Sequence, residues 1–319
     1  MEWEAYWQNL LAEKKLNNKV KELDRYEEII LKHAPRTEKI CRGIYERYDA
    51  MQKRLEAVKL DCITEFNAIE GVYLKSGRVK GKDSLLRKVI DKRQENIAAF
   101  DSKYYNLDEF NYDKIITDLV GIRLIINYRG KWIDIHRKIL GNFPLFDKEL
   151  YVENPLLEHR AGEKFQAEWP IVYYAQNDPI QEYRDEGLCV KLKEIGYRGI
   201  HYILSYEETY IEIQLRTIYD EAWSECDHNY VYKKDENRSH DALVQLSEIL
   251  NRLTHLSDIL NDTMKSVHDK EGIVFSQQEN VWTALSEHID SIDEIIAKLE
   301  ETDGIFRKFR NQLVDQQED

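Results

Sequence analysis

Two acidic residues stand where chemistry on phosphate would need them. Asp118 comes shortly before a β-branched run at residues 122–128, and Glu212 lies within an alternating run at residues 210–215. If both runs are strands of one sheet, the two carboxylates offer hard oxygen ligands to Mg²⁺ and leave its other positions to water and substrate phosphates. A surface Asp capping a turn and a Glu on the solvated face of an edge strand would give the same pattern.

Basic side chains stand near these carboxylates in the sequence. Arg78, Lys80, Lys88 and Arg123 could neutralise the charge that grows on a transferred phosphoryl or pyrophosphoryl group. Residues 75–93 carry eight basic side chains against two acidic ones. Composition alone does not separate a phosphate site from an ordinary solvated helix face. The Gly-x-x-x-x-Gly-Lys-Ser/Thr sequence of P-loop nucleotide sites does not occur.

A second polar group is expected around one hairpin. Alternate side chains of a strand share a face, so Glu212, Gln214 and Arg216 should form a polar row opposite an apolar set. Tyr197 and His201 precede that strand, near a glycine turn, where an aromatic ring can stack on a base and an imidazole can reach phosphate or ribose. Simple packing beside the turn is the alternative for Tyr197.

Five short motifs occur in one order at compatible spacing along residues 60–235. They are Gly77-Arg-Val-Lys80 with Ser84 and Lys88, Asp118-x-x-Gly-x-Arg123, Gly196-Tyr-Arg-x-x-His201, Glu212-Ile-Gln-Leu-Arg-Thr217 and Trp223-x-x-x-x-His228. Together they resemble the synthetase domain of the RelA/SpoT family of alarmone synthetases. The resemblance implies an α+β fold, in which a mixed β-sheet flanked by helices is related to nucleotidyltransferases. It also implies transfer of the β,γ-pyrophosphate of ATP to the 3′-hydroxyl of GDP or GTP, with release of AMP.

The resemblance assigns ATP to the basic side of the site. It implies that Arg78 and Arg123 hold the adenine between their guanidinium planes, and that Lys80 and Lys88 contact the phosphates. Ser84 belongs to the same motif and is grouped with these ATP-binding residues.

The resemblance also assigns the metal and the acceptor. Asp118 would be a Mg²⁺ ligand, and Glu212 would bind the metal or orient and deprotonate the attacking 3′-hydroxyl. Tyr197 would stack on the acceptor guanine. The other residues assigned to the acceptor side are Arg198, His201, Gln214 and Arg216.

Two other functions fit the same sequence. One is a toxic relative that pyrophosphorylates the 3′ end of tRNA or makes adenosine alarmones, for example in defence against phage. The other is a catalytically inactive nucleotide sensor. Binding to tRNA needs an extended basic surface, which the net charge of −14 does not favour. The intact acidic and basic positions argue against the sensor.

Periodicity and turn signals predict the elements that carry these residues. Asp83 or Ser84 is expected to cap a helix, and Thr217 is expected to cap the helix that follows the hairpin. Residues 141–194 form the least regular segment, expected to hold strands and a mobile loop. The predicted helices are 3–33, 37–62, 131–140, 243–260 and 289–299, and the predicted extended segments are 72–79, 122–128, 200–206 and 210–215.

The predicted organisation is an N-terminal helical region at residues 1–62, a synthetase domain at 63–235 and an acidic helical region at 236–319. Residues 234–319 carry 9 Lys/Arg against 19 Asp/Glu. These C-terminal helices could cover the core, join copies of the chain, bind a partner protein or restrain the site, and the sequence does not choose among these roles. A surplus of acid argues against DNA as a partner.

The sequence predicts a cytoplasmic protein that does not associate with membranes. Its four cysteines lie far apart and form no Cys-x-x-Cys pair, which is typical of reduced structural thiols. No apolar stretch of about 18 residues occurs, and the N-terminus lacks a basic segment leading into an apolar run.

Overall fold

The computed structural model describes most of the first 274 residues and a few later positions. The described residues are 2–31, 37–97, 102, 104–143, 170–175, 178–193, 196–207, 209–232, 240–274, 297, 300, 303, 304, 307 and 308.

Within these residues, six strands form one mixed sheet in the order β1-β2-β6-β5-β3-β4. The pairs β2/β6 and β3/β4 are parallel, and the other three neighbouring pairs are antiparallel. The predicted α+β fold with a mixed sheet is therefore confirmed, as is the antiparallel hairpin of β5 and β6. The strands are β1 (Leu74–Val79), β2 (Val120–Ile126), β3 (Ile171–Tyr174), β4 (Cys189–Leu192), β5 (Gly199–Tyr206) and β6 (Thr209–Thr217).

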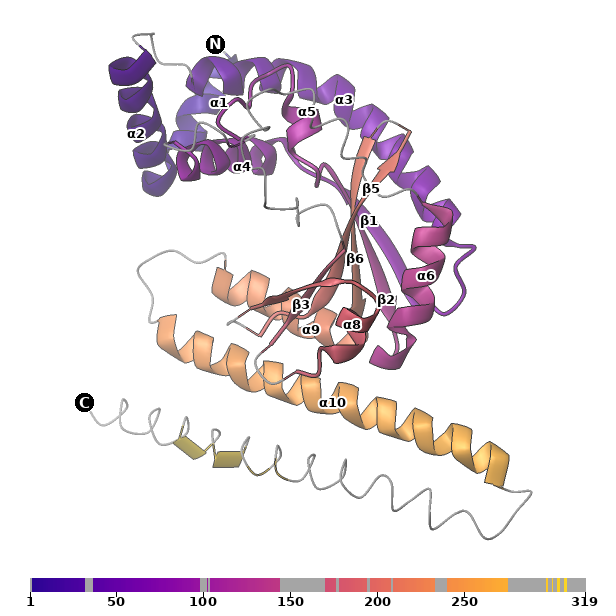
Figure 1. Cartoon of the computed structure of the whole chain (residues 1–319). Coiled ribbons are helices and arrows are strands. Elements are labelled where there is room, and N and C mark those ends of the chain that lie inside the picture. Colours follow the sequence, from indigo (N-terminus) through magenta and orange to yellow (C-terminus); the bar gives the residue numbers. More distant parts are fainter. Residues whose placement is uncertain are drawn as a thin grey trace.

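The two faces of the sheet differ in character. Helices α3 (Thr37–Phe66) and α6 (Trp132–Asn142) cover one face (Figure 1), where the apolar row of β6 is buried as predicted. Helix α9 (Ile218–Asp227) lies over the other face, beside the polar row. Thr217 caps α9 as predicted, because its hydroxyl accepts a hydrogen bond from the backbone N–H of Asp220 at 3.2 Å. The polar face is thus the one left for chemistry.

The prediction of one helix at residues 3–33 is wrong. The chain turns after residue 11, which separates α1 (Glu2–Leu11) from α2 (Lys14–Leu31). The two helices have different contacts: Trp3 of α1 packs on Tyr45 of α3, while Lys19 of α2 forms an ion pair with Asp91 of α4 (Lys82–Glu95). The helix predicted at 37–62 is confirmed as α3, which continues to Phe66, so the expected boundary at residue 62 falls inside it.

The predicted cap of α4 is also wrong. The N-cap is Gly81, which provides no side-chain hydrogen bond, and Asp83 lies in the first turn of the helix. The Asp83 carboxylate instead accepts a hydrogen bond from the Tyr6 hydroxyl of α1 at 2.5 Å. The Asp83 carboxylate, which the sequence pattern predicted as a helix cap, thus makes a tertiary contact instead.

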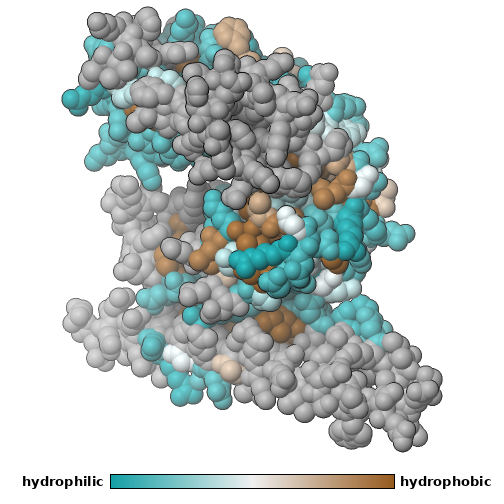
Figure 2. All heavy atoms as spheres, in the orientation of Figure 1, coloured by the Kyte–Doolittle hydropathy of each residue, from teal (hydrophilic) through white to brown (hydrophobic). Residues whose placement is uncertain are grey.

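Apolar residues from α1 to α6 and from the sheet share one hydrophobic core. Outside it, the described atoms on the face drawn in Figure 2 are mostly hydrophilic, with a smaller apolar area near the middle. Cys41 and Cys62 are buried in helix α3, and burial raises the pKa of each thiol to about 12. Among the described helices, none combines the length and the apolar character that crossing a bilayer requires.

The C-terminal half of the chain contains further predicted elements. The helix predicted at 243–260 is confirmed as part of α10 (His240–Val274), which packs on α9 (Figure 1). The irregular segment at 141–194 contains β3, β4 and the short helix α8 (Gln181–Asp185), and its expected loop falls mainly outside the described residues. The helix predicted at 289–299 also lies outside them, except for Ala297.

A buried ionic cluster attaches α10 to the rest of the fold. Arg129, in the 3-10 turn η1 (Arg129–Lys131), donates to Asp220 of α9 at 3.2 Å and to Asp258 of α10 at 3.0 Å. Asp258 is 1% exposed. Burial and the charge of Asp220 raise the pKa of Asp258 to about 7, even though Arg129 opposes the shift, and Asp262 lies close on the same helix.

The folding stability of the chain should therefore fall as Asp258 loses its proton with rising pH. The folded-state pKa of Asp258 is above the unfolded value of about 3.9, so the folded chain binds more protons between these values and loses stability toward neutral pH. We expect Asp258→Asn to be more stable relative to the wild type at about pH 8 than at about pH 5.5, by roughly 2 kcal/mol. Urea unfolding of both proteins at the two pH values measures this. Equal differences at both pH values would contradict it.

Candidate active site

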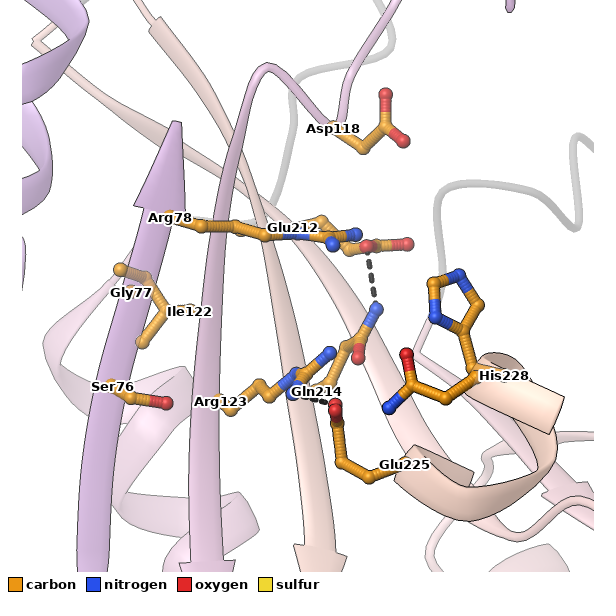
Figure 3. Close-up of a pocket in the computed structure, with 12 residues that line it drawn as sticks. Ser76, Gly77, Arg78, Asp118, Ile122, Arg123, Glu212, Gln214, Glu225 and His228 are labelled. Atoms are coloured by element: carbon orange, nitrogen blue, oxygen red, sulfur yellow. Dashed lines mark hydrogen bonds and ion pairs between the residues drawn. The ribbon is translucent and has the colours of Figure 1, made fainter. Parts of the chain in front are cut away.

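A pocket of about 260 Å³ lies on the polar face of the sheet, beside the π-helical turn η2 (His228–Tyr232). Five of the predicted site residues line it, and Figure 3 shows their side chains converging from β1, β2, β6 and the loop before β2. They are Arg78, Asp118, Arg123, Glu212 and Gln214.

Strand register brings Arg78 close to Glu212. Gly121 of β2 pairs with Arg78 of β1 on one side and with Glu212 of β6 on the other. Because Gly121 has no side chain, Arg78 crosses β2, with Cγ and Nε only 3.8 Å and 3.9 Å from where a Cβ would stand. Figure 3 shows the Arg78 side chain running across the strand toward Glu212.

Asp118 carries one engaged and one available oxygen. Its Oδ2 accepts from Lys80 Nζ at 2.9 Å and lies 2.7 Å from Lys88 Nζ. Its Oδ1 is buried and has no hydrogen-bond partner among the described residues. A buried carboxylate oxygen without a partner is costly. This arrangement fits a cation or a substrate group that completes the environment of Asp118.

Glu212 is held ionised at the centre of the site. His201 Nδ1 lies 3.3 Å from Glu212 Oε1, and Gln214 Nε2 donates to Oε2 at 2.7 Å. Burial opposes ionisation, but these two partners and the charge of Lys88 outweigh it and lower the pKa of Glu212 to about 2. Burial lowers the pKa of His201, so its ring is neutral at pH 7 and places its N–H toward the carboxylate.

The expected acceptor residues continue from Glu212 as one hydrogen-bonded chain. Tyr197 Oη lies 2.6 Å from His201 Nε2 and accepts from Arg216 Nη2 at 2.5 Å. The same Arg216 nitrogen donates to Gln214 Oε1 at 2.6 Å, and the guanidinium carbon lies 4.8 Å from the centroid of the Tyr197 ring. Tyr173 of β3 meets the rings of Tyr197 and His201 edge-on, at centroid distances of 5.7 Å and 4.8 Å. The sequence did not single out Tyr173.

Helix α9 adds acidic residues to the pocket. Arg123 Nη1 donates to Glu221 Oε1 at 2.7 Å and also pairs with Glu225. The other Glu221 oxygen accepts from Arg216 at 2.7 Å, so one glutamate joins the two arginines. Glu225 and His228 line the pocket, and their spacing from Glu221 places all three on one helical face. That spacing is a signal that the sequence could have provided.

Two predicted residues lie apart from this arrangement. Ser84 is exposed in the first turn of α4, one helical turn before Lys88. Arg198 is buried, and its guanidinium donates to both oxygens of Asp178, at 2.7 Å and 3.0 Å, and to Asn251 at 2.9 Å. These protein partners take the groups that were expected to contact the acceptor. We therefore interpret Arg198 as support for the turn that precedes Tyr197.

Apart from Ser76, the residues that line the pocket fall within a segment that matches a known family profile. Residues 77–237, half of the chain, match the profile described as "Region found in RelA / SpoT proteins". The chain belongs to the RelA/SpoT family. Membership of this family supports a pyrophosphokinase type of activity in general. A comparison with curated proteins found no match.

Solved structures from bacteria are similar at low identity. The small alarmone synthetase 1 of Bacillus subtilis bound to its product pppGpp is 18% identical, with a TM-score of 0.40, over 71% of this chain and 97% of that chain. A GTP pyrophosphokinase family protein of Streptococcus pneumoniae is 17% identical, with a TM-score of 0.37, over 73% and 93%. The small alarmone synthetase 2 of Bacillus subtilis is 18% identical, with a TM-score of 0.39, over 70% and 92%.

Proposed function

We propose that this RelA/SpoT protein is an ATP-dependent 3′-pyrophosphokinase that uses GDP or GTP as acceptor. The observation that supports it best is the joint placement of Asp118 and Glu212 in one pocket, together with Arg78 and Arg123. Two carboxylates beside two guanidinium groups suit a transfer that is catalysed by positioning and charge, without a covalent intermediate.

The donor set also fits Mg²⁺. Asp118 Oδ1 is buried without a partner among the described residues, and carboxylate oxygens are the ligands that Mg²⁺ prefers. We assign the ion to Asp118 and Glu212, with water and phosphate oxygens in its other positions. When bound, Mg²⁺ would withdraw negative charge from the triphosphate.

In this proposal the ATP-binding residues come from the β1, β2 and α4 side of Glu212, and the acceptor-binding residues come from β5, β6 and the turn before β5. Arg78 and Arg123 hold the adenine, and Lys80 and Lys88 reach the phosphates from beside Asp118. The exposed hydroxyl of Ser84 stays a proposed ATP contact on the same helical face as Lys88.

The acceptor end is formed by the chain of side chains that leads away from Glu212. Tyr197 stacks on the acceptor base, and His201, Gln214 and Arg216 fix the geometry around it. The acceptor 3′-oxygen attacks the β-phosphorus of ATP, the bond from that phosphorus to the oxygen bridging to the α-phosphate breaks, and AMP leaves. Glu212, ionised near neutral pH, orients the hydroxyl and takes its proton late, as the new bond forms.

A transfer assay tests this function. Purified protein with Mg²⁺ and ATP labelled in its γ-phosphate is offered GDP, GTP, AMP, ADP or deacylated tRNA in separate reactions. We expect label on GDP or GTP, and we expect Asp118→Asn to lower its transfer by at least about 100-fold, because the amide removes the charge that Lys80 and Lys88 balance.

The other products would point to other functions. Label on tRNA alone would support the toxic relative, and label on AMP or ADP alone would support synthesis of adenosine alarmones. Tight binding of ATP without transfer to any acceptor would support a nucleotide sensor and contradict the proposal.

A further inference from the structure

Helix α10 reaches the turn that carries the proposed acceptor residues. Asn251, which is 8% exposed, donates from Nδ2 to the carbonyl oxygen of Gly196 at 2.9 Å. Its Oδ1 accepts from Arg198 Nη1 at 2.9 Å, and the same nitrogen donates to the Gly196 carbonyl at 3.2 Å. One amide side chain therefore uses both its donor and its acceptor on the three-residue turn at 196–198.

The backbone at Gly196 is shaped around Asn251. Gly196 has a φ of +83°, which side-chain-bearing residues rarely adopt, and a Cβ there would lie 2.7 Å from Asn251 Oδ1. The Asn251 amide can approach residue 196 this closely because glycine has no Cβ. Asn251 thus occupies the space beside the turn as well as bonding to it.

The position of this turn decides where Tyr197 and His201 lie. Tyr197 follows Gly196 directly, and its hydroxyl reaches His201 and Arg216 across the start of β5. Arg198, the next residue, is anchored on Asp178, whose carboxylate also lies 3.7 Å from His255 Nε2 of α10. A shift of the turn would displace the Tyr197 ring with it, since no flexible segment separates them.

The same helix also supports the other wall of the site. The Trp223 indole of α9 donates to the Ser247 carbonyl oxygen at 3.0 Å, and Ser247 Oγ donates to Asp227 at 2.6 Å. Helix α10 starts at His240, after the family match ends at residue 237. Helix α10, which holds the turn at 196–198, therefore lies outside the segment that matches the family profile.

We propose that Asn251 is a positioning residue for the acceptor, acting through the Gly196 carbonyl to hold the Tyr197 ring in place. This inference rests on the proposed function, because it takes Tyr197 as the contact to the acceptor base. Asn251 itself lies behind the turn and is not among the residues that line the pocket.

The test compares three variants of the full chain. Asn251→Ala removes both hydrogen bonds. Asn251→Asp keeps the acceptor for Arg198, so the buried arginine stays paired, but loses the donor to Gly196 and sets an oxygen against that carbonyl. Asn261→Ala is the matched control, because it deletes an equivalent hydrogen bond from α10 to a backbone carbonyl, that of Asn127 at 2.5 Å, far along the helix from the turn. Melting temperatures show whether each variant folds.

Steady-state kinetics with GDP or GTP and with ATP then separate positioning from general stability. We expect both Asn251 variants to raise KM for the acceptor about tenfold, with KM for ATP within about twofold of the wild type, and Asn261→Ala to change neither. Equal effects on both substrates, or no difference from Asn261→Ala, would overturn the inference and leave the proposed function intact. A wild-type protein that transfers nothing would overturn the proposed function, and the inference with it.

Discussion

Replacing Glu212 by Gln should lower the rate of pyrophosphate transfer by about 1,000-fold while the protein stays folded. The carboxylate is ionised near neutral pH, since its pKa is about 2, and the amide has the same shape without the charge. The amide keeps one of the two oxygens that His201 and Gln214 now bond, and the backbone pairing of β5 with β6 does not involve this side chain, so the hairpin should keep its structure. In the proposed mechanism, the variant loses the negative charge that orients the attacking hydroxyl and takes its proton.

The measurement is single-turnover transfer from labelled ATP at saturating substrates, with circular dichroism to confirm folding. Glu207→Gln is a suitable control, because Glu207 lies in the exposed β5–β6 turn of the same hairpin and should retain full activity. If Glu212→Gln transfers pyrophosphate at a rate within about tenfold of the wild type, this carboxylate has no direct role in the chemical step.

Among the variants considered for stability, Arg93→Ala should lower the free energy of unfolding the most. Arg93 of α4 and Glu27 of α2 form a buried ion pair, and Arg93 also donates to the carbonyl oxygens of Tyr105 at 3.3 Å and Leu107 at 2.8 Å. Arg93→Ala would leave the Glu27 charge buried without its arginine, which costs about 3–5 kcal/mol. Urea unfolding should show this as a lower midpoint with a similar slope.

Two comparisons make the result specific. Lys19→Ala removes a pair with Asp91 that joins the same two helices in a partly exposed position, and should cost about 1 kcal/mol or less. The double variant Glu27→Leu/Arg93→Met replaces both charges by apolar groups and should recover much of the stability lost in Arg93→Ala. A cost for Arg93→Ala no larger than that for Lys19→Ala would contradict the prediction.

Local sequence signals predicted the strands and helices that carry the site. The alternation along β6 gave the buried apolar row and the polar row with Glu212, because side-chain direction in a strand depends only on the parity of the position. Thr217 could be assigned as a cap because the hydroxyl and its partner are three residues apart. The mixed sheet itself came from the resemblance to the RelA/SpoT family.

The protein partners of Arg198 and Arg123 could not be predicted, because they lie far away in the sequence. Asp178 and Asn251, which take the Arg198 guanidinium, lie 20 and 53 residues away from it. Glu221 and Glu225 are 98 and 102 residues away from Arg123. No short-range pattern reports such partners, so a charged residue in a motif looks free for substrate until the fold shows what already binds it.

The parallel pairing of β2 with β6 determines the order in which the enzyme can be assembled during synthesis. Residues 120–126 pair with residues 211–217, so a long stretch of chain must be made before β2 gains its second neighbour. Until then, the apolar β2 has an open edge, which is a template for pairing with other chains. The nascent protein holds Asp118 without Glu212 and so cannot carry out the proposed transfer. Pairing of β6 with β2 would therefore close this open edge and bring the proposed catalytic residues Asp118 and Glu212 together in a single folding event.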